Sequence, residues 1–91
     1  MTHAIVLIEA ERDKMSTLGA TLADVEGVRE AYSVTGEWDF VAIVAVHRHE
    51  ELADVVTARI NSLEGVRRTQ TMVAFEAFSR HDLEALFSIG G

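Results

Sequence analysis

The chain has 91 residues, a formal net charge of −7 and neither cysteine nor proline. This length predicts a single domain over residues 1–91, and the lack of cysteine excludes disulfides and thiolate metal sites. With only eight basic residues the chain is not expected to bind nucleic acid directly, and Arg29, Arg67 and Arg68 read as solvated charges at strand starts. The first apolar run is too short for a signal peptide or a membrane span, so we expect a cytoplasmic protein.

The first predicted elements are a strand over residues 3–10 and a helix over residues 14–25. The strand segment is dense in isoleucine, valine, leucine and alanine. Apolar residues recur at helical spacing in the second segment, at Met15, Leu18, Leu22 and Val25. We expect Asp13 to cap the start of this helix and Gly27 to end it. Gly19 lies inside the helix and predicts a close approach of the helix to the sheet.

The rest of the chain continues the pattern and partly repeats it. Four more elements are predicted, in the order strand, strand, helix and strand, over residues 28–34, 38–46, 49–63 and 66–78. The phrase Glu-Gly-Val-Arg occurs at residues 26–29 and again at residues 64–67, each time between a helix and a strand. This repeat predicts two copies of a βαβ unit.

The order βαββαβ predicts an α+β fold of the ferredoxin-like kind, with a four-stranded antiparallel sheet and two helices on one face. Apolar residues fill both alternating sets in the strand over residues 38–46, and two helices cover only one of the two faces. We therefore expect a homodimer packed sheet to sheet. The tail, residues 83–89, would cross to the partner or form a short extra strand; alternatively it folds back over its own sheet.

The turn between the two middle strands has the residues best suited to a small ligand. Gly36, Trp38 and Asp39 combine a permissive backbone, a large aromatic ring and a carboxylate, which together suit a zwitterionic amino acid. The same residues are equally typical of a plain hairpin turn, with Asp39 bonded to its own backbone and Trp38 packed at an edge. Thr69 and Thr71 would add hydroxyl groups if the last strand lies near the turn, although threonine is common in strands for its propensity alone.

Signals for metal binding and catalysis are weaker. His47 and His49 form a His-x-His pattern that binds zinc when a third ligand converges, but they stand at a strand-to-helix junction rich in charge. A solvated surface without a metal is the expectation there. The chain has no cysteine nucleophile, no glycine-rich phosphate loop and no Ser-His-Asp set in a suggestive context. We predict no cofactor, no catalytic residues and no enzyme.

Two motifs resemble one known family. The segment from Val34 to Phe40 is similar to the G-x-Y-D segment of the Lrp/AsnC effector-binding domain, also called the RAM domain, with Trp38 in place of the usual tyrosine. The segment from Leu63 to Thr71 resembles the GV-x-x-T-x-T motif at the start of the last long strand of that domain. The likeness extends over most of the chain. The regulators of this family also have an N-terminal helix-turn-helix domain, so the resemblance implies a stand-alone effector-binding domain.

The resemblance implies a function as well. Such domains dimerise through their sheets, assemble further into rings and bind small amino acids at contacts between dimers. Gly36 and Asp39 would bind the main-chain groups of the ligand, Trp38 would line the pocket, and Thr69 and Thr71 would add polar contacts. The module would modulate transcription without binding DNA itself, for example by joining full-length Lrp/AsnC regulators. Two alternatives stay open: a cofactor-independent enzyme of the dimeric α+β barrel kind, and a purely structural oligomerisation module.

Overall fold

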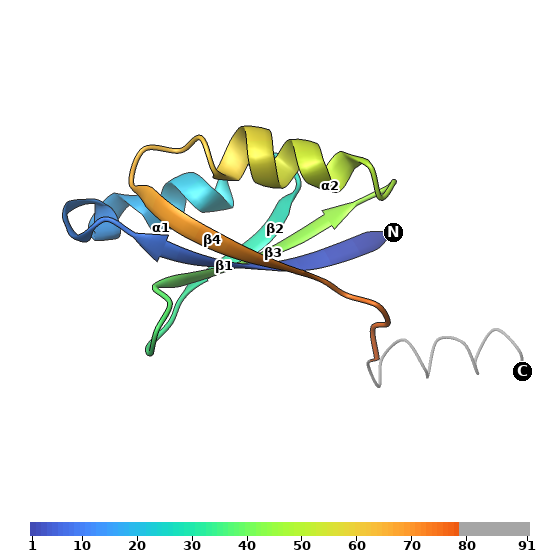
Figure 1. The fold of residues 1–91 in the computed structure, drawn as a ribbon, viewed down its shortest axis with the longest axis horizontal. Helices are drawn as coiled ribbons and strands as arrows, with labels where there is room; N and C mark the ends of the chain where they lie inside the picture. The colour runs from blue at the N-terminus through green and yellow to red at the C-terminus, as the bar shows by residue number, and fades with distance from the viewer. Residues whose placement is uncertain (79–91) are drawn as a thin grey trace, which may run out of the picture.

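The computed structural model describes residues 1–78 and has two layers. A four-stranded antiparallel sheet forms one layer, and the helices lie together on one of its faces (Figure 1). The predicted α+β fold and its βαββαβ order are confirmed. None of the helices in residues 1–78 has the length and apolar character needed to cross a lipid bilayer.

The strand order in the sheet is β2-β3-β1-β4, so β3 and β1 are the central strands. In chain order the elements are β1 (Thr2–Ala10), the short 3-10 helix η1 (Arg12–Lys14), α1 (Met15–Ala23), β2 (Val28–Ser33), β3 (Phe40–Val46), α2 (Glu51–Ala53), the π-helical η2 (Asp54–Ile60) and β4 (Val66–Val73). Because α2 and η2 are consecutive, they form one helical segment, which lies on the same face of the sheet as α1 (Figure 1).

Two local predictions are wrong. Asp13 does not cap a helix, because it lies inside η1, and neither η1 nor α1 has a side-chain capping bond at its start. The last strand ends at Val73 instead of residue 78. Its partner β1 begins at Thr2, and the Ala74 N–H already donates to the His3 carbonyl at 2.9 Å, so β4 reaches the end of its partner there. The predictions for the tail, residues 83–89, lie outside the described residues.

The core lies between the sheet and the helices and is wholly apolar. Its fully buried large side chains are Val6, Ile8, Leu18, Leu22, Val44 and Ile60. No polar or charged side chain is buried in residues 1–78. Gly19 faces this core as predicted, because a Cβ atom at that position would lie 3.2 Å from Cε1 of Phe40. Each large apolar side chain that is fully buried contributes about 1.5–3 kcal/mol, so this layer is the main source of stability.

The repeated Glu-Gly-Val-Arg phrase has the same local structure in both copies. Gly27 and Gly65 have φ values of +101° and +100°, in the left-handed region that favours glycine. Cβ atoms there would lie 2.7 Å from Cγ2 of Val55 and 2.6 Å from Cβ of Lys14. Each glycine turn therefore packs tightly against a helical element of the other half of the chain.

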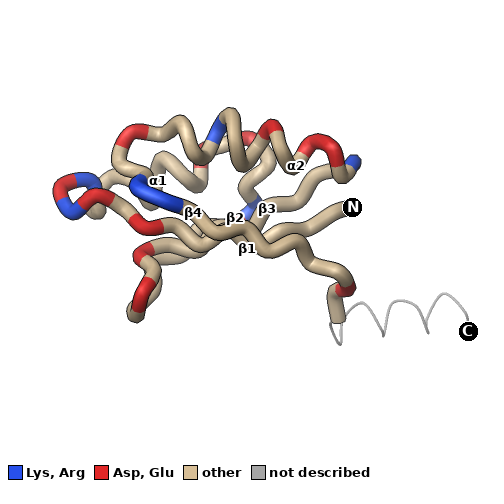
Figure 2. Tube along the Cα trace, in the orientation of Figure 1, with Lys and Arg blue, Asp and Glu red and all other residues tan. Residues whose placement is uncertain are grey.

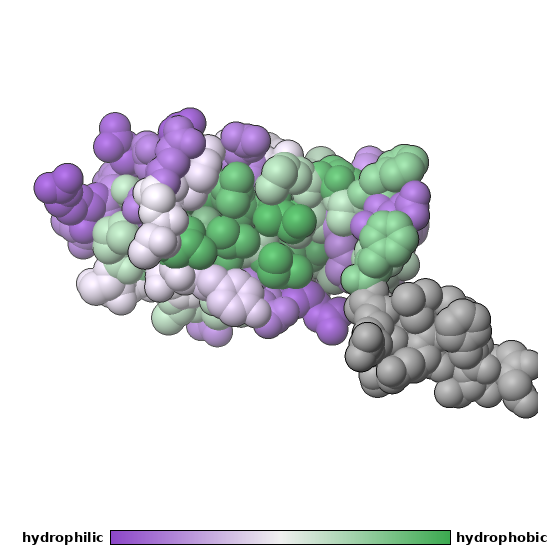
Figure 3. Space-filling view, turned by 90° about the horizontal axis from the view of Figure 1, so that it is seen from below, coloured by the Kyte–Doolittle hydropathy of each residue, from purple (hydrophilic) through white to green (hydrophobic). Residues whose placement is uncertain are grey.

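The second face of the sheet, which we call the open face, is covered by no helix of residues 1–78. Ile5 of β1 pairs with Ile43 of β3 and with Met72 of β4, and Leu7 pairs with Val41, so these side chains share one side. Figure 3 looks at the open face and shows a hydrophobic centre, with hydrophilic side chains at the left of the view and a mixture of both kinds at the right. Met72 is 42% exposed. The apolar face predicted from the sequence is present, and sheet-to-sheet dimer packing through it stays a prediction.

Candidate functional site

A pocket of about 290 Å³ opens where β1 ends, the first helical segment begins and the β2–β3 loop passes; we call it the β1-end pocket. Its lining residues are Glu9, Ala10, Arg12, Met15, Glu37, Asp39 and Arg67. The volume lies just below the range of about 300–1,000 Å³ that is typical for drug-sized ligands. The pocket therefore has room for a small metabolite.

Asp39 holds the β2–β3 loop against the end of β1. Its Oδ2 accepts a hydrogen bond from the Ala10 N–H at 2.8 Å, and its own N–H donates to the Ile8 carbonyl at 2.9 Å. Its carbonyl accepts from the Val34 N–H at 3.0 Å, which closes the loop. Asp39 thus lines the pocket, and one of its two carboxylate oxygens already has a backbone partner on β1. Its contact with a ligand stays a prediction.

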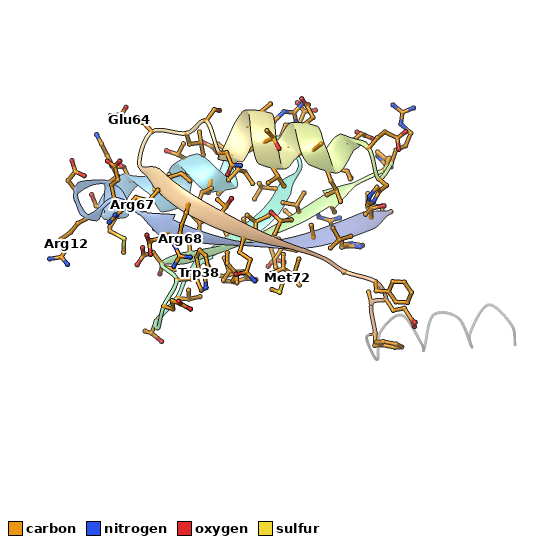
Figure 4. The ribbon with its side chains drawn as sticks, in the orientation of Figure 1. Arg12, Trp38, Glu64, Arg67, Arg68 and Met72 are labelled. Atoms are coloured by element: carbon orange, nitrogen blue, oxygen red, sulfur yellow. The ribbon has the colours of Figure 1, made fainter. Side chains whose placement is uncertain are left out.

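Trp38 lies on the open face, outside the lining of the β1-end pocket. The guanidinium carbon of Arg68 is 4.4 Å from the ring centroid, well within the roughly 6 Å limit for a cation–π interaction. Arg68 pairs with Glu9 in the sheet register, two residues before the Gln70–Leu7 pair of the open face. Figure 4 shows the ring below the sheet, on the side away from the helices.

Gly36 forms the exposed tip of the same loop. Its φ is +108°, and no atom lies within 4 Å of the position that a Cβ would take. Glycine is required there by the backbone conformation and not by crowding. The loop tip is therefore open to solvent or to another molecule.

Thr69 and Thr71 are not brought together with the loop. They pair with Ile8 and Val6 of β1, whose buried side chains face the helices, so both threonines lie on the helix side of β4. The Thr69 hydroxyl donates to Oδ1 of Asn61 at 2.7 Å. Sequence reasoning could have separated them from the loop only by knowing that β1 lies between β3 and β4.

Apart from Asp39, the charged residues that line the β1-end pocket, Glu9, Arg12, Glu37 and Arg67, were not among the predicted site residues. Oε1 of Glu9 is 3.8 Å from Nε of Arg67, and Oε2 of Glu9 is 3.4 Å from Nη2 of Arg68. Oε1 of Glu37 is also 3.8 Å from Nη2 of Arg68. Arg67 and Arg68 are more than solvated charges at a strand start, because they contact acids from two other segments. The signal available in the sequence was that the two arginines are adjacent.

Basic residues gather at this end of the acidic molecule and are interspersed with acidic ones (Figure 2). Arg12, Lys14, Arg67 and Arg68 are four of the eight basic residues, and Figure 2 shows them where β1 leads into α1 and where β4 begins. Lys14 forms an ion pair with Glu64, whose Oε1 is 3.2 Å from Nζ of the lysine. The hydrogen bond between these side chains and the charge of Glu64 raise the pKa of Lys14 above its ordinary value of 10.5. The two guanidinium groups that line the pocket belong to Arg12 and Arg67.

A second pocket, of about 220 Å³, lies at the opposite end of the sheet near His47 and η2. Its charges are paired internally: Nη2 of Arg59 is 3.0 Å from Oδ2 of Asp54, and Nη1 donates to the Glu26 carbonyl at 2.9 Å. No group of three possible metal ligands in residues 1–78 is arranged to hold a metal ion. The β1-end pocket also contains an ion pair, between Glu9 and Arg67, but its other guanidinium group, that of Arg12, forms no ion pair with residues 1–78. This makes the β1-end pocket the better candidate for a ligand site.

The fold defines a small α+β domain with ferredoxin-like topology. A family model described as the Lrp/AsnC ligand binding domain matches residues 3–83, and the chain belongs to this family. The resemblance noted in the sequence is thereby confirmed at the level of the family.

Individual relatives agree with this assignment. An uncharacterized HTH-type transcriptional regulator of Pyrococcus furiosus is 35% identical over 77 residues, which are 81% of this chain and 51% of the regulator. The chain thus spans about half the length of the regulators it matches. A crystallised protein of Thermus thermophilus is 49% identical, with a TM-score of 0.82 over 88% of this chain and 100% of that one. A Neisseria meningitidis transcriptional regulator, solved in complex with L-Met, has the same fold at 16% identity, with a TM-score of 0.77 over 87% of this chain and 53% of that one.

Proposed function

We propose that the chain is an effector-binding module that takes a small amino acid into the β1-end pocket and modulates transcription through its own assembly. One observation carries the proposal: the walls of the pocket bear both guanidinium and carboxylate groups. Arg12 and Arg67 stand among the lining residues with Glu37 and Asp39. A zwitterion presents a carboxylate to the first pair and an ammonium to the second, which makes it the ligand chemistry that such a lining favours.

Each lining residue has a role in this proposal. The ligand carboxylate binds Arg12 and Arg67, because guanidinium–carboxylate pairs are among the stronger hydrogen-bonded contacts. The ligand ammonium binds Glu37 and the free oxygen of Asp39. Met15 lies beside the ligand side chain. The proposal keeps Asp39 in the site and keeps Gly36 as a contact from the loop tip, although Gly36 does not line the pocket. Trp38 supports the pocket through Arg68. Thr69 and Thr71 face the helices, and we leave them out of the site.

Assembly through the open face completes the proposed function. Its apolar centre, with Ile5, Ile43 and Met72, suits a homodimer packed sheet to sheet, because soluble monomers seldom leave such a surface in water. A ligand bound near a contact between subunits stabilises the oligomer that contains the contact. Higher oligomers, and mixed assemblies with full-length Lrp/AsnC regulators, would carry the signal to DNA.

The two alternative functions are less well supported. An enzyme of the dimeric α+β barrel kind would need polar groups between sheet and helices, and the described residues in that layer are apolar. This observation favours ligand binding. A purely structural oligomerisation module differs from the proposal only in lacking a ligand, so a binding experiment separates the two.

The test is the molar mass in solution, measured by light scattering after size exclusion, with each of the twenty amino acids at millimolar concentration. L-methionine comes first, because the Neisseria relative was solved with it. Calorimetry then compares the Arg67→Met variant with Arg29→Met, which removes an exposed arginine of β2 that does not line the pocket. Losing a hydrogen bond to a charged group costs about 1.5–3 kcal/mol, so we expect Arg67→Met to weaken binding roughly ten- to hundredfold and Arg29→Met to leave it unchanged.

The proposal fails if none of the twenty amino acids changes the molar mass or releases heat on mixing. The structural module would then be the better interpretation. If both arginine variants weakened binding equally, the chain would still bind the ligand, but the site would not be the β1-end pocket.

A further inference from the structure

Arg67 and Arg68 are consecutive in β4 but serve two different surfaces. Arg67 lines the β1-end pocket, and Arg68 lies against the ring of Trp38 on the open face. Consecutive side chains of a strand point to opposite sides, so two neighbouring positions of β4 can serve both surfaces at once. Figure 4 shows the two arginines at the start of β4, with the tryptophan below the sheet.

Glu9 of β1 is shared between the two arginines. One of its carboxylate oxygens is 3.8 Å from Arg67 and the other is 3.4 Å from Arg68. The pairing of β1 with β4 shifts register between Glu9 and Ala10, and such a bulge re-aims the side chains beside it. The Glu9 side chain is only 27% exposed, against 63% for Arg67 and 52% for Arg68. The carboxylate is thus the least hydrated member of this group of three.

We infer that Glu9 couples the β1-end pocket to the open face. The inference concerns the regulation of that pocket and rests on the proposed function. A ligand carboxylate that binds Arg67 takes the place of Glu9 there. Glu9 is then held by Arg68 alone, which fixes the Arg68 guanidinium on the ring of Trp38.

This exchange gives the coupling a direction. Ligand in the pocket orders Trp38 and Arg68 at the edge of the surface where a second copy would dock, so binding favours assembly. By reciprocity, assembly that orders the same ring strengthens ligand binding by the same factor. Partly exposed ion pairs are individually weak, so we expect a coupling of about two- to fivefold.

The coupling is testable without any ligand, because Trp38 is the only tryptophan of the chain and its fluorescence reports on this ring. The measurement is acrylamide quenching of the wild-type protein, Arg67→Met, Glu9→Gln and the double variant. Arg67→Met releases Glu9 toward Arg68 and should lower the quenching constant, whereas Glu9→Gln should raise it. The double variant should equal Glu9→Gln. Arg29→Met, on β2, is the control and should match the wild type.

Two results would overturn the inference. The first is that Arg67→Met does not change the quenching constant. The second is that Arg67→Met changes the constant by the same amount in the wild-type protein and in the Glu9→Gln variant. Circular dichroism and unfolding midpoints establish that each variant is folded. Glu37→Gln removes the other acid near Arg68 and is a further control. Arg67→Met should still lower the quenching constant when it is combined with Glu37→Gln.

A ligand arm separates this inference from the proposed function. L-methionine is titrated into the wild-type protein while heat and Trp38 emission are recorded together. Heat with a matching change of emission supports both ideas. Heat without a change of emission refutes the coupling and leaves the binding function intact. Absence of heat counts against methionine as the ligand, while the quenching cycle still decides whether Glu9 connects the two surfaces.

Discussion

Replacing Asp39 by alanine tests whether this residue holds the β2–β3 loop in place. The change removes the acceptor that lies 2.8 Å from the Ala10 nitrogen. Ala10 is only 6% exposed, so water has poor access to the N–H that is left without a partner. A buried polar group without a hydrogen bond costs about 1–3 kcal/mol, and we expect Asp39→Ala to lower the free energy of unfolding by that amount.

Two further variants sharpen this test. Asp39→Asn keeps an oxygen acceptor of nearly the same shape and should cost less than Asp39→Ala. Asp13→Ala removes an exposed aspartate that makes no capping bond, and it should stay within about 0.5 kcal/mol of the wild type. The comparison of alanine variants therefore separates a general effect of lost negative charge from the loss of this one hydrogen bond.

The assay is urea unfolding followed by circular dichroism. All proteins are measured at one protein concentration, because the stability of a self-associating protein depends on its concentration. Equal m-values would show that the variants change stability and not the extent of unfolding. If Asp39→Ala costs no more than Asp13→Ala, the loop is not held by this bond, and the value of Asp39 lies in ligand contact only.

Three other perturbations test the fold and the assembly. Gly27→Ala and Gly36→Ala force a side chain into the same left-handed conformation, but of these two only the Cβ at position 27 would meet another atom, at 2.7 Å. In urea unfolding, Gly27→Ala should lower the free energy of unfolding by about 1–3 kcal/mol more than Gly36→Ala. Equal losses for the two variants would contradict the packing at Gly27. The pKa of Lys14 is raised by Glu64, so the stability from this pair is fully present below pH 10.5 and is lost as the pH rises through the raised pKa. Glu64→Gln should flatten that alkaline decline in thermal unfolding, and an unchanged pH profile would refute the assignment. Ile43→Glu places a charge on the open face and should give a monomer by light scattering; an unchanged molar mass would count against dimerisation through this face.

Much of the fold follows from local pattern. The spacing of Leu18 and Leu22 and the length of the apolar runs identify the helix and strands. When one side of an element is buried, apolar residues recur with the helical period in a helix and at every second residue in a strand. The end of β4 was not predictable in this way. The apolar character of the sequence continues to Phe78, yet a strand needs a partner, and the pairing with β1 closes at His3.

The candidate site was predicted only in part. Gly36 and Asp39 mark the loop because their residue types are informative without knowledge of the fold. Glu9, Arg12 and Arg67 are ordinary surface residues in the sequence, and they become a group only when the ends of β1 and β4 are placed side by side. Residue type cannot supply that placement, since it depends on a strand order in which β1 and β4, the first and last strands of the sequence, lie side by side.

The strand order also interleaves the strands of the two repeated halves. In the described sheet, β1 pairs with β3 and β4, and β2 pairs with β3, so each pairing joins a strand of the first half to a strand of the second. Within that sheet neither half has a strand pairing of its own, and each glycine turn packs against the helical segment of the other half. Cleavage in the β2–β3 loop would therefore yield two fragments that are unfolded when apart and complementary when mixed. The β2–β3 loop that connects the two halves sets only their effective concentration relative to each other. The corresponding half of a second molecule would pair equally well.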